Sequence, residues 1–283
     1  MKNLFAFLTV LIVCHAAYPA ELFGTVDAIS GIGFVSDNSG NTSGISKGQK
    51  IYEGQTITTA SDSEVHLVTE DGGVLALRPD TKFRVDEYKA DGDSADKIFM
   101  SLFKGAVRSI TGWIGKHNTS AYRITTPTAT IGVRGTDHET TVIENGGGDE
   151  PGTYDTVNEG STILKTARGE TEVSPGKFAF VPKSRAAAPY LLTKQPNFWA
   201  TRRLRIEGRI QQRKAYYHHR MERMRDERIK QVRSNRAKQY NRVGGQHGNE
   251  RYRDHHGQAE VKHNELRERQ LERARRHRES PRE

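Results

Sequence analysis

Short segments that alternate apolar and polar residues fill the chain between residues 22 and 181 and recur about every 8–14 residues. Successive side chains of a β-strand point to opposite faces, so alternation such as Val65-His66-Leu67 predicts strands that are buried on one face only. The predicted strands are Leu22–Ile29, Thr56–Thr59, Glu64–Thr69, Val74–Leu77, Lys82–Tyr88, Ile98–Ser109, Ala121–Thr126, Glu139–Ile143, Ser161–Thr166 and Lys177–Val181.

Turn-forming residues separate these segments. The pairs Asp71-Gly72 and Asp91-Gly92 tolerate positive φ and favour tight hairpins. No amphipathic helix of twelve residues is predicted before residue 197, so the spacing indicates an all-β body, either solenoid-like or a sandwich or barrel. The longest predicted loop, Asn145–Asp155, is rich in glycine and is either a binding loop or slack between strands.

Residues 1–20 have the pattern of a secretory signal peptide. One cation, Lys2, precedes an apolar run at residues 4–13, and small residues follow. A membrane span needs about 20 apolar residues, which no segment supplies. We therefore expect an exported protein, periplasmic or secreted, that does not span a membrane. The only cysteine, Cys14, lies in this segment, so the mature chain would have no thiol for a disulfide, metal site or nucleophile.

Charge divides the rest of the chain into two parts, a body at residues 21–197 and a tail at residues 198–283. The tail holds 25 Lys and Arg against 12 Asp and Glu, whereas residues 1–197 hold 19 against 23. The protein is therefore a mildly acidic body with a strongly basic tail.

Parts of the tail are expected to be helical. Asn197 is placed to cap a helix, and a second helical or coiled-coil stretch is predicted at Ala259–Arg278. Alone, such helices would be partly formed, and the alternative is a solvated, disordered extension. The first helix rests on apolar residues that recur on one face, namely Ile206, Ile210, Tyr217, Met221 and Met224.

The tail's charge suggests a polyanionic partner. Anionic lipid headgroups or cell-wall polymers fit an exported protein. Nucleic acid would also attract the arginines, but export disfavours it.

Three stretches of the body resemble the FecR domain family. Gly54–Thr59, followed by Asp71–Leu77, resembles the first motif of the family. The segment Ile124–Thr136, which contains Thr-Pro and Arg-Gly-Thr, is similar to its most specific signature. The segments Val157–Gly160 and Ser174–Val181 resemble its closing hairpin. The resemblance as a whole extends over roughly residues 24–181.

This resemblance implies a β-rich, solenoid-like domain that acts by binding and has no cofactor. The iron-regulator members carry a cytoplasmic anti-sigma segment and a membrane span, and this chain shows neither; Gln55 also replaces the usual Asp of the first motif. The motif residues, which we expect to be structural, are Gly54, Thr56, Ile57, Thr59, Asp71, Gly72, Thr126, Pro127, Arg134, Gly135, Thr136, Gly160 and Gly176.

Arg134 has two interpretations. Its rigid fork of five donors lies between Gly132 and Gly135, where it could pin exposed carbonyl groups inside the sheet. Alternatively, it lies at the surface and binds a carboxylate or phosphate. The consecutive residues Asp137-His138-Glu139 could suggest a metal site, but neighbours on a strand point to opposite faces and cannot converge.

No motif of an enzyme stands out. There is no nucleophile elbow or His-Glu-x-x-His, and no carboxylate spacing identifies a glycan hydrolase. Two hypotheses remain ahead of an enzyme. The first is an exported, non-catalytic module of the bacterial envelope whose body binds a protein or glycan; the alternative is a periplasmic signal-input component that regulates a sigma factor or transport system.

Overall fold

The computed structural model describes residues 20–145, 148–184, 186–201, 208, 210, 223 and 225–238. The expected signal peptide and the predicted helix at Ala259–Arg278 lie outside these residues. The chain forms two compact units, Met1–Ile229 and Lys230–Glu283. In the second unit, residues 230–238 are described and are helical. Among the residues described, no helix combines the length and the apolar character that a bilayer crossing requires.

The first unit is built from strands, as the alternation predicts. Its helical elements are α1 (Trp113–His117), the 3₁₀ turn η1 (Thr119–Ala121) and α2 (Asn197–Thr201). Its strands are β1 (Leu22–Ser30), β2 (Gly33–Ser36), β3 (Thr42–Gly44), β4 (Lys50–Tyr52), β5 (Thr56–Thr59), β6 (Glu64–Thr69), β7 (Val74–Leu77), β8 (Lys82–Lys89), β9 (Lys97–Ile110), β10 (Tyr122–Thr125), β11 (Thr130–Ile143), β12 (Gly152–Thr166), β13 (Gly169–Val173), β14 (Phe178–Pro182) and β15 (Tyr190–Leu191).

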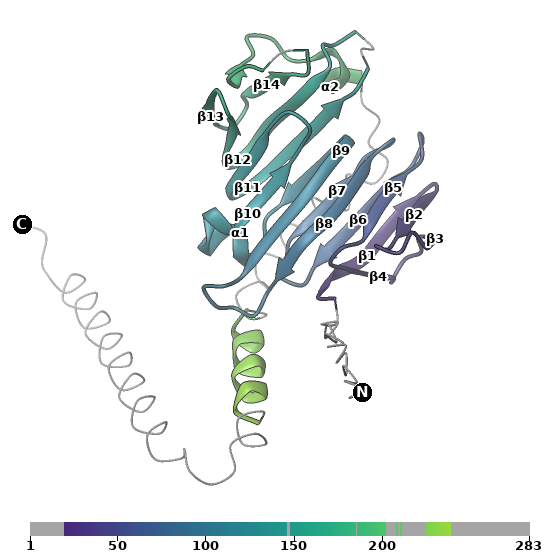
Figure 1. The fold of residues 1–283 in the computed structure, drawn as a ribbon, viewed down its shortest axis with the longest axis vertical. Coiled ribbons are helices and arrows are strands. Elements are labelled where there is room, and N and C mark those ends of the chain that lie inside the picture. Colours follow the sequence, from purple (N-terminus) through teal and green to yellow (C-terminus); the bar gives the residue numbers. More distant parts are fainter. Residues whose placement is uncertain are drawn as a thin grey trace, which may run out of the picture. The chain divides into compact units, whose positions relative to one another are not determined.

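One sheet folds on itself into two layers. Its main path runs β15-β14-β12-β11-β10-β9-β7-β6-β1-β4, and the branch β3-β2-β5-β8 joins it through β9 (Figure 1). Every pairing between the strands is antiparallel except β9 with β10. A solenoid of parallel coils would pair its strands in parallel. Of the two predicted forms of the all-β body, the structure therefore has the sandwich.

Three long strands carry the sheet from one layer to the other. The first part of β9 pairs with β8 and β10, and its second part pairs with β7 and β11. The strand bends at Gly105, which has φ +82. Strands β11 and β12 bend at Gly135 and Gly160, with φ +58 and +76. Glycine adopts positive φ without the Cβ penalty of other residues, so it suits these corners.

A single large core lies between the layers. It joins fully buried side chains of one layer, such as Leu67 and Leu75, to Phe83 and Met100 of the other. Each strand buries few apolar side chains, so a lone hairpin would be marginal and the layers stabilise each other.

One prediction about local structure needs correction. Asn145–Asp155 is not one loop, because β12 begins at Gly152. Asn197 begins α2 as expected, and another part of the chain contributes to the cap. Asp149 accepts the backbone N–H groups of Asn197 and Phe198 at 2.9 and 2.8 Å. The glycine-rich loop therefore supplies the capping carboxylate to the start of the tail.

Candidate functional site

A row of charged side chains crosses one face of the sheet. The pairing places His66 beside Ala76, Ala76 beside Arg108 and Arg108 beside Glu139, across β6, β7, β9 and β11. We call this face, with Glu64, His66, Arg78, Arg108, Asp137 and Glu139, the charged face. Each of these six residues is buried, with at most 6% exposure.

The burial of these residues differs from the prediction, in which each strand is buried on one face only. Both faces of β6 are buried, including Glu64 and His66. Alternation had assigned these polar residues to solvent, because polar positions in a strand are usually exposed. The sequence gives one signal that could have located them, namely several charged residues at alternate positions of neighbouring strands.

Arg78 is the centre of the charged face. Its guanidinium donates to Glu64 Oε1 at 2.5 Å and to Glu139 Oε2 at 2.8 and 3.3 Å. His66 Nε2 lies 3.0 Å from the same Glu64 oxygen. Burying a charge costs several kcal/mol per ion unless it is paired and hydrogen-bonded, so one arginine offsets two buried carboxylates here.

A second buried pair lies on the same face. Arg108 donates to both carboxylate oxygens of Asp137 at 2.8 Å, and the Asn158 amide donates to Asp137 at 3.2 Å. The two-point contact fits the planar guanidinium fork. The orientation of the Arg108 side chain is therefore fixed, and Asp137 lies two residues from Glu139 of the Arg78 network on β11.

Asp137, His138 and Glu139 diverge as alternation predicts. Asp137 and Glu139 join the charged face, whereas His138 Nδ1 lies 3.0 Å from Asp155 on the other face. Among the residues that the structure describes, no group of His, Cys, Asp and Glu could hold a metal ion.

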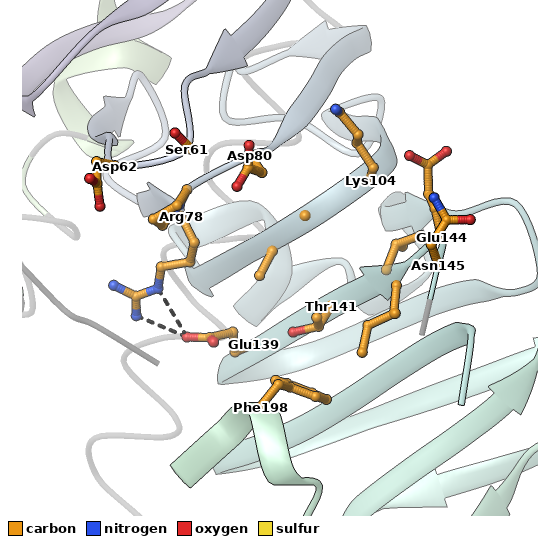
Figure 2. A pocket seen from close by; sticks show the side chains of 15 residues that line it. Ser61, Asp62, Arg78, Asp80, Lys104, Glu139, Thr141, Glu144, Asn145 and Phe198 are labelled. Atoms are coloured by element: carbon orange, nitrogen blue, oxygen red, sulfur yellow. Dashed lines mark hydrogen bonds and ion pairs between the residues drawn. The ribbon is translucent and has the colours of Figure 1, made fainter. Parts of the chain in front are cut away.

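A cavity of about 800 Å³ opens at the Arg78 end of the charged face. Figure 2 shows Arg78 and Glu139 joined across it, with Lys104 and Glu144 along another side and Phe198 of α2 below. The carboxylates of Asp62 and Asp80 also line it. Acidic side chains outnumber basic ones, so the cavity favours a cationic group.

Residues of the first FecR-like motif position the loop that carries Arg78, which lines this cavity. Thr59 Oγ1 donates to the Arg78 carbonyl at 2.6 Å and accepts the Thr81 N–H at 2.9 Å. Thr59 therefore fixes the loop that carries Arg78. Ile57 is fully buried, Thr56 is partly buried on the same strand, and Gly54 has φ +83.

Asp71 and Gly72 form the tight turn between β6 and β7. Gly72 has φ +76, and the Asp71 carboxylate accepts the Thr69 hydroxyl at 2.5 Å. The Asp71 N–H donates to the Tyr88 hydroxyl at 2.8 Å. Complete burial raises the pKa of Asp71 and of Tyr88 because desolvation disfavours their charged forms. These contacts position the turn, so we retain a structural role for both motif residues as a proposal.

The Thr-Pro and Arg-Gly-Thr segment also forms backbone contacts. Thr126 Oγ1 donates to the Ala129 carbonyl at 2.9 Å, which closes the turn that contains exposed Pro127. The Thr136 N–H donates to Thr111 Oγ1 at 3.0 Å. Gly176 has φ +76, and its N–H donates to the Val157 carbonyl at 2.9 Å.

Arg134 does not lie inside the sheet. Its side chain is exposed on β11, so the interpretation of Arg134 as an internal pin is wrong. The buried guanidinium groups are those of Arg78 and Arg108, which the motif comparison did not single out. A bend at Gly135 leaves Arg134 on the outer side of the strand.

Replacing Arg134 with alanine should change the free energy of unfolding by less than about 0.5 kcal/mol, as for most exposed positions. Thermal melting monitored by circular dichroism measures it. Arg108→Ala serves as the comparison, because it removes the guanidinium that contacts both carboxylate oxygens of buried Asp137. A large loss of stability in Arg134→Ala would restore the pinning role.

Aromatic and cationic side chains gather on the outer face of β8, β9 and β10. The guanidinium of exposed Arg123 lies 4.0 Å from the ring centre of Phe99, and Lys97 Nζ lies 5.9 Å from it. Lys82 Nζ lies 5.6 Å from the ring of Phe103, whose exposure is 40%. We call these five residues the aromatic face. Arginine and aromatic residues are enriched where proteins bind proteins.

Comparison with known proteins agrees with the sequence motifs. Residues 55–161 match the family model described as FecR protein. Two solved structures of a protein from Parabacteroides distasonis ATCC 8503, described provisionally as an anti-sigma factor, align at 14% identity with a TM-score of 0.41. The alignment covers 51% of this chain and 62% of that protein. No curated protein matches the chain. The family match spans β5 to the bend of β12 and identifies residues 55–161 as a FecR domain.

Proposed function

We propose that this protein is a non-catalytic signal-input component whose FecR domain binds another protein and thereby regulates a sigma factor or a transport system. The observation that carries the proposal is the family match over residues 55–161. It favours the signalling alternative over a general envelope-binding module, because FecR domains belong to regulatory proteins. The signal-peptide pattern of residues 1–20 supports a periplasmic role.

The aromatic face supports a protein partner. It lies within the matched residues, and Phe103 and Arg123 project from neighbouring strands of one layer. Exposed aromatic and arginine side chains supply much of the binding energy at protein interfaces when a partner covers them. Glu139, which lines the cavity, is instead engaged with Arg78, which suits a structural role better than proton transfer.

Deletion of the gene should change the transcript level of a transport or sigma-factor operon, measured by RNA sequencing. The wild-type gene should restore the level, whereas a Phe103→Ser and Arg123→Ala double variant should not. Tyr190→Ser is the matched control, because Tyr190 is 39% exposed and lies outside the FecR match.

Unchanged transcripts after deletion would refute the signalling proposal. Full restoration of the transcript level by the double variant would show that the aromatic face is not the surface that binds the partner. Capture of an envelope glycan, but no protein, by the purified full chain would favour the general binding module instead.

A further inference from the structure

Part of the basic tail lies against the turn that joins β8 to β9. Arg228 Nε donates to the Ala90 carbonyl at 3.1 Å, and the Arg228 guanidinium lies 3.9 Å from the Asp91 carboxylate. Ile229 lies so close to Gly92 that a Cβ at Gly92 would overlap Ile229 Cγ1. All of these residues belong to the first unit. The contact joins parts of the chain that are 138 residues apart.

The body holds this turn in place by hydrogen bonds. The buried Asp96 carboxylate accepts the N–H groups of Asp91 and Gly92 at 2.7 and 2.8 Å and the indole N–H of Trp113 at 3.1 Å. Gly92 has φ +80, a conformation that glycine adopts without the Cβ penalty of other residues. The absence of a Cβ also leaves the space that Ile229 occupies. A surface that is already ordered costs less free energy to bind.

The charges of the turn and of the tail are complementary. The turn carries three carboxylates, namely those of Asp91, Asp93 and Asp96. Lys89 of β8 lies 3.6 Å from Asp91 and 3.4 Å from Asp93. The described helical residues 225–238 hold six Lys and Arg against two Asp and Glu. One of these cations, Arg225, lines a cavity of about 430 Å³ together with Asp93 and Asp96. A basic helix therefore meets an acidic turn.

One face of this helix is shielded from solvent. Within residues 225–238, the side chains of Arg225, Arg228, Ile229 and Val232 are partly buried and the others are exposed. These four positions have the spacing of neighbours on one face of a helix. A helix of this length is marginal in water on its own, so the contacts of this face with the turn account for its order.

We propose that the turn at residues 90–96 is an electrostatic latch for the basic tail, and that residues 225–238 are helical because this latch holds them. Ile229 supplies the apolar contact over Gly92, and Arg225 and Arg228 supply the positive charge. While the latch is closed, these two arginines face the body and are not available to an anionic partner. Salt screens the ionic part of the contact and weakens the latch.

Hydrogen–deuterium exchange of the full chain tests the latch from the side of the turn. Gly92→Ala should raise the exchange rate of the amides of residues 225–238 at least about 5-fold, which corresponds to about 1 kcal/mol, because the new Cβ takes the place of Ile229. Gly48→Ala is the matched control. Gly48 has φ +87, but a Cβ there would meet nothing within 4 Å, so tail exchange should not change. The amides of β9 report whether the body remains folded.

Ile229→Ala tests the same contact from the side of the helix and leaves the turn intact. Alanine is a better helix former than isoleucine, so faster exchange of residues 225–238 in this variant cannot come from a weaker helix. Gln231→Ala, at an exposed position of the same helix, should leave exchange no faster than in the unmodified chain.

The ionic part of the latch has its own measurement. Raising the salt concentration from about 0.05 to 0.5 M shortens the range of charge interactions about threefold and should accelerate exchange of residues 225–238 in the unmodified chain. Arg228→Gln should exchange faster at low salt and respond less to added salt, because it lacks the contact with Asp91.

Equal tail exchange in Gly92→Ala and Gly48→Ala would overturn the latch, since the helix would then not depend on the turn. Unchanged exchange in Ile229→Ala would overturn it as well, even if Gly92→Ala disturbs the body. Exchange that does not respond to salt would show that the contact is apolar and not an electrostatic latch. All of these measurements use the purified full chain, so their outcome does not depend on whether the protein signals.

Discussion

Arg78→Ala should lower the free energy of unfolding by about 3–5 kcal/mol, the cost typical of breaking a buried ion network. The substitution removes the cation that contacts both Glu64 and Glu139. The two carboxylates would then remain buried without this partner and repel each other. Urea denaturation followed by circular dichroism measures the change, and an unaltered m-value would show that the same surface is exposed on unfolding.

Arg84→Ala is the matched control for this experiment. Arg84 Nε lies 3.6 Å from Asp86, and its side chain is 42% exposed. An exposed ion pair contributes at most about 1 kcal/mol. A loss in Arg78→Ala as small as that in Arg84→Ala would contradict the role assigned to the buried network.

Gly160→Ala should destabilise the fold by about 2–5 kcal/mol. Gly160 has φ +76, and a Cβ there would overlap the Gly135 carbonyl oxygen and lie 3.0 Å from that of Arg134. The left-handed backbone costs an alanine about 1–2 kcal/mol, and the overlap adds about 1–3 kcal/mol. The bends of β11 and β12 cross at this point, so neither strand can move away independently. Urea denaturation measures the difference from the unmodified protein.

Gly176→Ala separates these two causes. Gly176 has the same φ of +76, but a Cβ there would meet nothing within 4 Å. Its substitution should therefore cost only the backbone contribution of about 1–2 kcal/mol. Equal losses in the two variants would mean that the close approach of β11 and β12 does not constrain the fold.

The boundaries of a strand were predictable where the whole strand lies in one layer of the sheet. Thr56–Thr59, Glu64–Thr69 and Val74–Leu77 begin and end at the predicted residues. Strands β11 and β12 were each predicted over less than half of their length. Each of them passes from one layer to the other, so its alternation changes phase at a glycine bend and no single pattern covers the strand.

The candidate site was much less predictable. The family-like motifs directed attention to Arg134, which is exposed, and not to Arg78 or Arg108. Glu64 and His66 had the polar positions of an ordinary surface strand. They are buried among hydrogen-bonded partners, since Arg78 contacts Glu64 and Glu64 contacts His66, and local periodicity carries no information about such contacts.

The sequence by itself determined the β-rich body, its main turns, the basic tail and the resemblance to FecR domains, because these depend on side-chain alternation, turn residues and charge close together along the chain. The tertiary structure decided which charges are buried and which residues meet in the cavity. Arg78 and Glu139 are 61 residues apart in sequence, and only the pairing of β7, β9 and β11 brings them into contact.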